Sequence, residues 1–326
     1  MRMGINVKTT IVIPNYNGIQ YLADCLQSLQ QPGNKAHIIV VDNGSTDGSQ
    51  AYLRQIFPKV ELIEFTENKG FCTAVNTGIQ ASKTPYVILL NNDTKVYSNF
   101  VLYLEQAIAQ SDKIFSVASK MIVMQKPDIL DGAGDLYCAF GWAFARKKGK
   151  PVDQADIPCK IFSACGGAAI YRKEIFQRIG LFDENHFAYL EDLDIGYRAR
   201  IYGYINYYEP KACVLHAGSG FSGSRYNEFK TGLSSKNSIY MIYKNMPLLQ
   251  ILLNLPFLIF GFLVKAAFFI RKGFGKTYMR GIYKGIVFSC SSSAKEKKIP
   301  FSINHIAHYS SIQLDLWLNI WKCLIN

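Results

Sequence analysis

Short apolar runs in the first hundred or so residues each end abruptly in a cluster of polar side chains. The runs are rich in β-branched residues, and apolar residues recur at helical spacing after each of them. This pattern predicts strands that are covered on both faces, each followed by a helix. The predicted strands cover residues 9–13, 37–41, 60–65 and 87–90.

Strands that alternate with helices at this spacing predict an α/β fold with a mostly parallel central sheet and right-handed crossovers. Open sheets of this kind bind ligands beyond the carboxyl ends of their strands. The four predicted strands are followed by polar residues that include Asn15, Asp42, Asn68 and Asp93. The sequence therefore predicts a polar site at one edge of the sheet.

Asn92 and Asp93 have a second interpretation, because Asn and Asp are common caps and a helix is predicted to begin near residue 99. For this stretch alone the two interpretations are equally good. The similar endings of the three other strands favour a site.

Two common nucleotide-binding motifs are missing from the sequence. No Gly-x-Gly-x-x-Gly follows the first predicted strand, and no Gly-x-x-x-x-Gly-Lys-Ser/Thr occurs. The Asn, Asp, Ser and Thr residues at the strand ends suit hydrogen bonding to a ribose and a base, and Asp42 is expected to accept from such donors. The charge of a diphosphate must then be met by another group.

The polar clusters resemble the motifs of inverting family 2 glycosyltransferases. The motifs are Ile13-Pro14-Asn15-Tyr16-Asn17, Val41-Asp42-Asn43-Gly44-Ser45-Thr46-Asp47-Gly48, Asn68-Lys69-Gly70, Leu90-Asn91-Asn92-Asp93, Gly166-Gly167-Ala168-Ala169, Gly180-Leu181-Phe182-Asp183-Glu184, Tyr189-Leu190-Glu191-Asp192-Leu193-Asp194 and His216-Ala217-Gly218-Ser219. The resemblance covers roughly residues 8–225 and is greatest to bacterial rhamnosyltransferase-type enzymes that build surface polysaccharides. It implies a GT-A fold, which is a nucleotide-sugar-binding α/β domain.

By this resemblance the chain takes a sugar donor linked to dTDP, UDP or GDP. The expected donor-binding residues are Pro14, Asn15, Asn17, Asp42, Asn43, Ser45, Asn68, Lys69, Gly70, Asn76, Asn92, Asp93, Gly166 and Gly167. The Gly166-Gly167 pair is expected beside the donor sugar, where glycine permits a close approach of the backbone.

The resemblance also implies a divalent cation, Mg²⁺ or Mn²⁺, on the donor diphosphate. Asp93 takes the place of the last acid of the family's Asp-x-Asp motif, whereas Asn91 and Asn92 replace the earlier acid. One carboxylate can suffice where phosphate oxygens and water complete the shell of the cation. His216 matches a metal-ligating histidine of the family, and its alternative is a packed histidine at a strand end.

Glu191, Asp192 and Asp194 open a predicted helix, where acids complement the helix dipole without any further function. The resemblance instead assigns the general base to Asp192. Because consecutive helical residues point about 100° apart, Glu191 is expected to support Asp192 rather than face the same hydroxyl. An inverting transfer needs one such base, which takes the proton of the acceptor hydroxyl as it attacks the anomeric carbon.

The composition changes near residue 240. The formal net charge is +12, and the chain from Tyr240 onward carries eleven Lys or Arg against Glu296 and Asp315. Residues 246–264 carry no charge but include Asn254 and Pro256. We therefore predict a catalytic domain over residues 1–235 and a basic, apolar helical tail over 236–326.

The tail is expected to lie on the cytoplasmic face of the cell membrane, held by apolar side chains and anionic lipid. A single span would carry the later Lys and Arg residues to the far side, against the positive-inside rule. Residues 301–325, with Trp317 and Trp321, are predicted to form a second such helix. The alternative is a soluble helical cap or a dimer interface.

Three other classes of feature are not indicated. The positive residues alternate with long aliphatic stretches, so nucleic acid is not an expected partner. The eight cysteines show no Cys-x-x-Cys or zinc spacing, which favours reduced thiols. The start of the chain shows no secretory apolar region, because residues 11–13 are too short a run and meet Pro14.

The sequence thus predicts a membrane-associated inverting glycosyltransferase that moves a sugar, rhamnose or another hexose, to a saccharide acceptor on a polyprenyl lipid in surface polysaccharide biosynthesis. A nucleotidyltransferase is one alternative, although residues 15–18 lack the Lys or Arg expected after its first strand. A non-catalytic nucleotide-sugar-binding module is another, favoured by Asn91 and Asn92.

Overall fold

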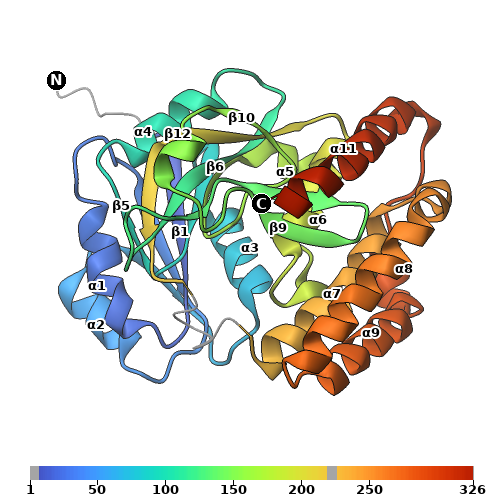
Figure 1. The fold of residues 1–326 in the computed structure, drawn as a ribbon. Coiled ribbons are helices and arrows are strands. Elements are labelled where there is room, and N and C mark those ends of the chain that lie inside the picture. The colour runs from blue at the N-terminus through green and yellow to red at the C-terminus, as the bar shows by residue number, and fades with distance from the viewer. Residues whose placement is uncertain (1–6, 219–225, 326) are drawn as a thin grey trace.

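The parallel core of the sheet agrees with the sequence pattern (Figure 1). The computed structural model describes residues 7–218 and 226–325, so Ser219 of the expected motif lies outside the described residues. Four strands pair in parallel in the order β4-β1-β2-β3: β1 (Thr9–Asn15), β2 (His37–Asp42), β3 (Glu61–Glu64) and β4 (Tyr86–Leu90). Their carboxyl ends meet at one edge, as predicted.

The remaining strands make the sheet mixed. β11 (Ala168–Arg172) runs antiparallel between β4 and β6 (Ile114–Val123), and β12 (Ile205–His216) lies parallel to β6. Short strands complete the sheet: β5 (Thr94–Val96), β7 (Leu130–Gly132) and β10 (Cys159–Ile161), while β8 (Asp135–Cys138) and β9 (Trp142–Ala145) form a separate hairpin. The pairing of β5 with β12 sets Thr94 opposite His216, which brings Asp93 beside this histidine.

Helices cover both faces of the sheet, because its central strands are apolar on both sides. In β1, Ile11 and Ile13 face one hydrophobic cluster and Val12 faces the other, and all three are fully buried. The first cluster includes α1 (Ile19–Ser28), α2 (Ser49–Ile56) and α4 (Phe100–Ile108). The second includes α3 (Phe71–Ala81), α5 (Phe176–Ile179) and α6 (Glu191–Ile201).

The C-terminal helices lie beside the sheet domain and share a core with it (Figure 1). They are α7 (Glu228–Asn245), α8 (Leu248–Arg271), α9 (Gly275–Ser289), α10 (Ser292–Lys297) and α11 (Ile306–Ile325), and short 3₁₀ helices cover Val152–Ala155, Lys173–Ile175, Glu184–His186 and Ile303–His305. Leu193 of α6, Met241 of α7 and Leu316 of α11 belong to one buried cluster. The predicted boundary between residues 235 and 236 falls inside α7.

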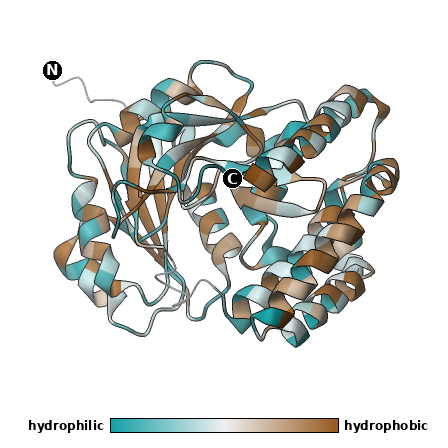
Figure 2. Ribbon diagram, viewed as in Figure 1, coloured by the Kyte–Doolittle hydropathy of each residue, from teal (hydrophilic) through white to brown (hydrophobic). Residues whose placement is uncertain are grey.

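The α8 helix leaves most of its apolar side chains exposed, and Figure 2 shows hydrophobic residues along α8 and α9. It is long and apolar enough to cross a membrane by length and composition, with 17% of its apolar window buried. Pro256 lies inside the helix without ending it. Asn254 is fully buried and exchanges hydrogen bonds of 2.8 Å with Gln313 of α11, so it joins the two helices.

Candidate functional site

A cavity of about 380 Å³ lies at the edge where the parallel strands end. Its walls come from the strand ends, from the start of α6 and from the end of β12. Most of the residues expected from the sequence line it: Pro14, Asn15, Asn43, Asn68, Asn92, Asp93, Gly167, Glu191, Asp192 and His216. The structure therefore brings the expected donor, metal and base residues to one place.

A chain of amide and carboxylate side chains ties three strand ends together. Asn92 Nδ2 donates to Asn15 Oδ1 at 2.7 Å, and Asn15 Nδ2 donates to Asp42 Oδ2 at 2.8 Å. Asp42 is fully buried, and its Oδ1 accepts from Gln50 Nε2 at 2.7 Å. The same Oδ1 accepts from the N–H of Ser45 at 2.9 Å, so Asp42 joins the strand ends behind the cavity.

Other expected donor-binding residues shape the cavity from behind. Seven of the expected residues, all in the described part of the chain, do not line the cavity: Asn17, Asp42, Ser45, Lys69, Gly70, Asn76 and Gly166. Asn76 lies on α3, where its Nδ2 donates to Phe182 O at 2.8 Å and its Oδ1 accepts from Phe182 N at 3.0 Å. Both ends of this amide thus bond to the backbone of Phe182.

The loops behind the cavity are held by short polar side chains. Ser45 Oγ accepts from the backbone N–H of Asn17 at 2.9 Å, and Asn43 Oδ1 accepts from the N–H of Lys69 at 2.8 Å. Gly70 has a φ of +89°, and a Cβ there would lie 2.6 Å from Phe187 Cδ2. Only glycine fits at this position without moving the loop before α6.

Asp93 and His216 form the candidate metal centre together with a residue that the sequence did not indicate. His216 Nε2 lies 3.4 Å from Asp93 Oδ1, and Nδ1 lies 2.7 Å from Oδ2 of Asp131. Lys148 Nζ pairs with the other oxygen of Asp131. A carboxylate behind a histidine fixes the orientation of the ring, so Nε2 faces Asp93 and could bind a cation in place of its proton.

The charges around this histidine are strongly coupled. Burial lowers the pKa of His216, but hydrogen bonds and charge from Asp131 and Asp93 outweigh it and raise the pKa to about 9. Burial alone would raise the pKa of Asp131, whereas the hydrogen bond from His216 and the nearby Lys148 ammonium hold it well below its usual range. His216 is thus held as an imidazolium between Asp93 and Asp131, and a cation that binds at Nε2 would take the place of its proton.

The base candidates lie in an acidic, poorly hydrated group. Burial raises the pKa of Glu191 to about 7, and burial together with the charge of Glu191 raises that of Asp192 well above its usual value. Burial and the charge of Asp192 also raise the pKa of Asp135, on β8, to about 7. Carboxyl groups with such raised pKa values are suited to take up a proton near neutral pH.

Gly166 contributes through the space that it leaves. A Cβ at this position would lie 2.8 Å from Oδ1 of Asp192. The glycine therefore lets the backbone pack directly against the base candidate. The sequence indicated Gly166, but as a neighbour of the donor sugar.

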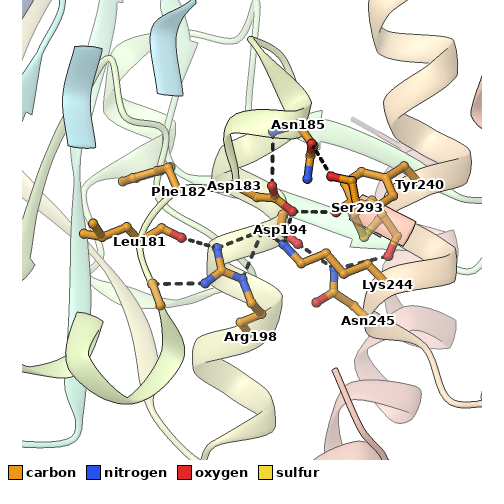
Figure 3. A network of polar contacts seen from close by, with 12 residues as sticks. Leu181, Phe182, Asp183, Asn185, Asp194, Arg198, Tyr240, Lys244, Asn245 and Ser293 are labelled. Atoms are coloured by element: carbon orange, nitrogen blue, oxygen red, sulfur yellow. Dashed lines mark hydrogen bonds and ion pairs between the residues drawn. The ribbon is translucent and has the colours of Figure 1, made fainter. Parts of the chain in front are cut away.

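A second group of potential metal ligands lies outside the cavity. Single ligand atoms of Asp183, His186 and Asp194 all lie within 4.8 Å of one another. Lys244 Nζ already lies 2.7 Å from Asp183 Oδ2 and 2.9 Å from Asp194 Oδ2 (Figure 3). Arg198 also pairs with Asp194 at 2.8 Å. Two cationic side chains thus occupy this group, and it forms an ion-pair network.

Sequence reasoning missed the residues that support the site from other elements. Asp131 lies on β7 and Asp135 on β8, and Phe187 and Phe229 line the cavity together with Asp192. None belongs to a motif that the pattern of strands and helices singles out. A carboxylate in an apolar surrounding, as in Ile129-Leu130-Asp131, is the one signal that could have drawn attention to Asp131.

Comparison with known proteins agrees with this geometry. The model of the family described as glycosyl transferase family 2 matches residues 10–180, more than half of the chain. The N-acetylglucosaminyl-diphospho-decaprenol L-rhamnosyltransferase of Mycobacterium tuberculosis is 25% identical over 222 residues, which cover 60% of this chain and 70% of that protein.

Two solved glycosyltransferase structures share the fold. GalNAc-T7, solved with UDP, GalNAc and Mn²⁺, superposes with a TM-score of 0.59 at 18% identity. The match covers 74% of this chain and 48% of the GalNAc-T7 chain. The mannosyltransferase PcManGT from Pyrobaculum calidifontis, solved with GDP-Man and Mn²⁺, superposes with a TM-score of 0.52 at 15% identity. The match covers 97% of this chain and 86% of the PcManGT chain. With its GT-A-like fold and its family match, the chain belongs to glycosyltransferase family 2.

Proposed function

We propose that this glycosyltransferase moves a hexose, with inversion, from a nucleoside diphosphate to a saccharide on a polyprenyl lipid. The observation that carries the proposal is that Asp93 and His216 share one cavity with Glu191 and Asp192. One pair can hold a cation and the other can accept a proton. A single displacement needs these two functions on opposite sides of the anomeric carbon.

The donor side rests on the strand ends. Asn68 and Asn92 line the cavity and offer amides to a base and a ribose, while the amides of Asn15 and Asn43 bond to neighbouring groups and shape its wall. A divalent cation held by Asp93 and Nε2 of His216 would neutralise charge on the departing diphosphate. The mixed oxygen and nitrogen donors suit Mn²⁺ better than Mg²⁺, which prefers oxygen ligands throughout. Both solved relatives described above hold Mn²⁺.

The acceptor side rests on Asp192. In the proposed reaction its carboxylate takes the proton of the acceptor hydroxyl while that oxygen forms a bond to the anomeric carbon. The bond from this carbon to the diphosphate oxygen breaks at the same time, and the nucleoside diphosphate leaves with the electron pair. Burial and then the charge of Glu191 raise the pKa of Asp192, so its carboxylate binds a proton more strongly. Phe187, Tyr189 and Phe229 offer apolar walls to the acceptor.

Transfer from dTDP-, UDP- and GDP-linked sugars to a polyprenyl-diphosphate saccharide, with Mn²⁺ present, tests this proposal. The expected product has the opposite anomeric configuration to the donor, as read by NMR. A product of retained configuration would refute the displacement. Release of diphosphate from a nucleoside triphosphate would support a nucleotidyltransferase, and donor binding without turnover would support a non-catalytic module.

We also propose that the C-terminal helices dock on an anionic membrane at the cytoplasmic face, where nucleotide sugars are available. Exposed apolar side chains gather on α8, α9 and α11, among them Leu249, Leu263, Ile286, Leu318 and Trp321. Lys and Arg residues accompany them on the same helices, including Arg271, Lys276, Arg280 and Lys322. Apolar insertion combined with basic charge is typical of helices that lie in the membrane interface.

Vesicle sedimentation tests the docking. The protein is expected to bind vesicles that contain phosphatidylglycerol more tightly than vesicles of phosphatidylcholine alone, and salt should weaken the difference. Exchange of Leu249, Leu263 and Trp321 for serine should release it. A protein that stays in the supernatant with both vesicle types, in the absence of detergent, would exclude this surface as a membrane site.

A further inference from the structure

The backbone directly before α6 has an unusual conformation. Phe187 has a φ of 63° and a ψ of −60°, and the N–H of Ala188 donates to His186 O at 2.7 Å. This is a γ-turn of the rare positive-φ form. Tyr189 and Leu190 follow with φ values of 67°. Non-glycine residues adopt such conformations only where the surrounding structure holds them there.

Asn237, in the middle of α7, holds this segment through its carbonyl groups. Its Nδ2 lies 2.9 Å from the carbonyl oxygens of His186 and Ala188 and 2.8 Å from that of Tyr189. The side chain is fully buried. One amide thus binds three carbonyl oxygens that converge because of the left-handed turns, and buried carbonyl groups need such partners.

Lys244, two turns further along α7, binds residues on both sides of the segment 186–190. Its ammonium group bridges Asp183, which precedes the segment, and Asp194, which follows it in the first turn of α6 (Figure 3). The three side chains are at most 3% exposed. Asn245 also donates to Asp194 Oδ1 at 2.8 Å. The start of α6 is therefore fixed to α7 by buried polar contacts.

We propose that α7 is a positioning element for the general base. Asn237 and Lys244 hold residues 186–190 and the start of α6 in the one arrangement that directs Asp192 at the acceptor hydroxyl. Neither residue is among the described residues that line the cavity, so both act through Asp192. The proposal rests on the proposed function, because it takes Asp192 as the base. It gives this part of the C-terminal region a role in catalysis in addition to membrane docking.

Kinetics of the full-length protein test the proposal, with Asn237→Ala as the main variant. We expect kcat to fall about 10- to 100-fold, the loss typical of a small displacement of a reacting group. The Kd for UDP, GDP or dTDP, whichever the parent binds with Mn²⁺, should stay within about threefold, because the strand ends are untouched. Lys244→Met should behave similarly, and Lys244→Arg should recover most of kcat because it keeps the charge between the two carboxylates.

Ser238→Ala is the matched control. Ser238 is a buried polar neighbour on the same helix, and its hydroxyl bonds only to Ser234 O of α7 among the described residues. Its loss should leave kcat unchanged. If Asn237→Ala keeps kcat within about threefold of the parent, or lowers kcat and nucleotide affinity together, the positioning role is wrong.

Hydrogen exchange on the parent protein tests the same proposal without a variant. Peptides that cover residues 183–194 should exchange far more slowly than those of the exposed turn at residues 124–128. Equal exchange in the two segments would show that α7 does not hold the turn, even if Asn237→Ala fails to fold. A parent protein that transfers no sugar would refute the proposed function, whereas normal transfer by both the parent and Asn237→Ala would refute the positioning role alone.

Discussion

Oδ2 of Asp131 lies 2.7 Å from Nδ1 of His216, on the side of the ring away from Asp93. The contact holds a proton on Nδ1 and directs Nε2 toward the place where a cation would meet Asp93. Loss of a carboxylate that orients a ligating histidine typically lowers metal affinity about 10- to 100-fold. The geometry thus extends the candidate metal centre beyond the residues of the family motif.

Asp131→Ala should therefore weaken binding of Mn²⁺ by about 10- to 100-fold. Titration followed by the EPR signal of free Mn²⁺, with the nucleoside diphosphate present, measures this directly. Asp93→Ala should weaken binding at least as much, because it removes a ligand. Asp128→Ala is the matched control, since that carboxylate is exposed and close in sequence. Unchanged Mn²⁺ affinity in Asp131→Ala would contradict the assigned role of Asp131.

Gly166→Ala should displace the base candidate. The added Cβ would lie 2.8 Å from Oδ1 of Asp192, so the carboxylate must move. We expect kcat to fall about tenfold or more, with nucleotide affinity little changed. In the control Gly232→Ala the added Cβ meets Thr277 Cγ2 at an ordinary 3.5 Å, and activity should be unaffected. Full activity of Gly166→Ala would show that the position of Asp192 next to Gly166 does not matter for catalysis.

Glu191→Gln should stabilise the protein, and more so at pH 8 than at pH 5. Burial raises the pKa of Glu191 from 4.5 to about 7 in the folded chain. A carboxyl group with a raised pKa favours folding while it is protonated, so its contribution is lost as the pH rises from about 4.5 to 7. The uncharged amide avoids this loss, which amounts to at most about 3 kcal/mol.

Denaturant unfolding at both pH values measures this gain. Glu67→Gln is the matched control, because the side chain of Glu67 is exposed. If Glu191→Gln changes the free energy of unfolding equally at pH 5 and pH 8, the pKa of Glu191 is not raised in the folded protein.

Local sequence pattern predicted the parallel core well. A fully apolar run is typical of a strand buried on both faces, and Asp42 and Asp93 were found at the ends of such strands. The antiparallel β11 and the pairing of β5 with β12 were beyond prediction, because they join segments far apart in the chain without a local signal. Those pairings bring His216 to Asp93.

The sequence predicted the motif residues that face the cavity. It did not predict the residues of other elements that hold those motif residues in place. Asp42 stood in a strand-end motif and Asn76 in the expected donor-binding set, yet both make their hydrogen bonds to groups of the protein. Asp131 and Asn237 lie in segments whose pattern shows only a short strand or an ordinary helix. Their roles follow from long-range packing, which a single sequence does not display.

The rate of sugar transfer by Asp192→Asn at saturating donor tests the central claim most directly. The amide keeps the shape of the side chain but cannot take up the proton of the acceptor. We predict that turnover falls by about 10² to 10⁴, while Kd for the nucleoside diphosphate with Mn²⁺ stays within about threefold of the parent. Turnover within a few-fold of the parent would show that Asp192 is not the base.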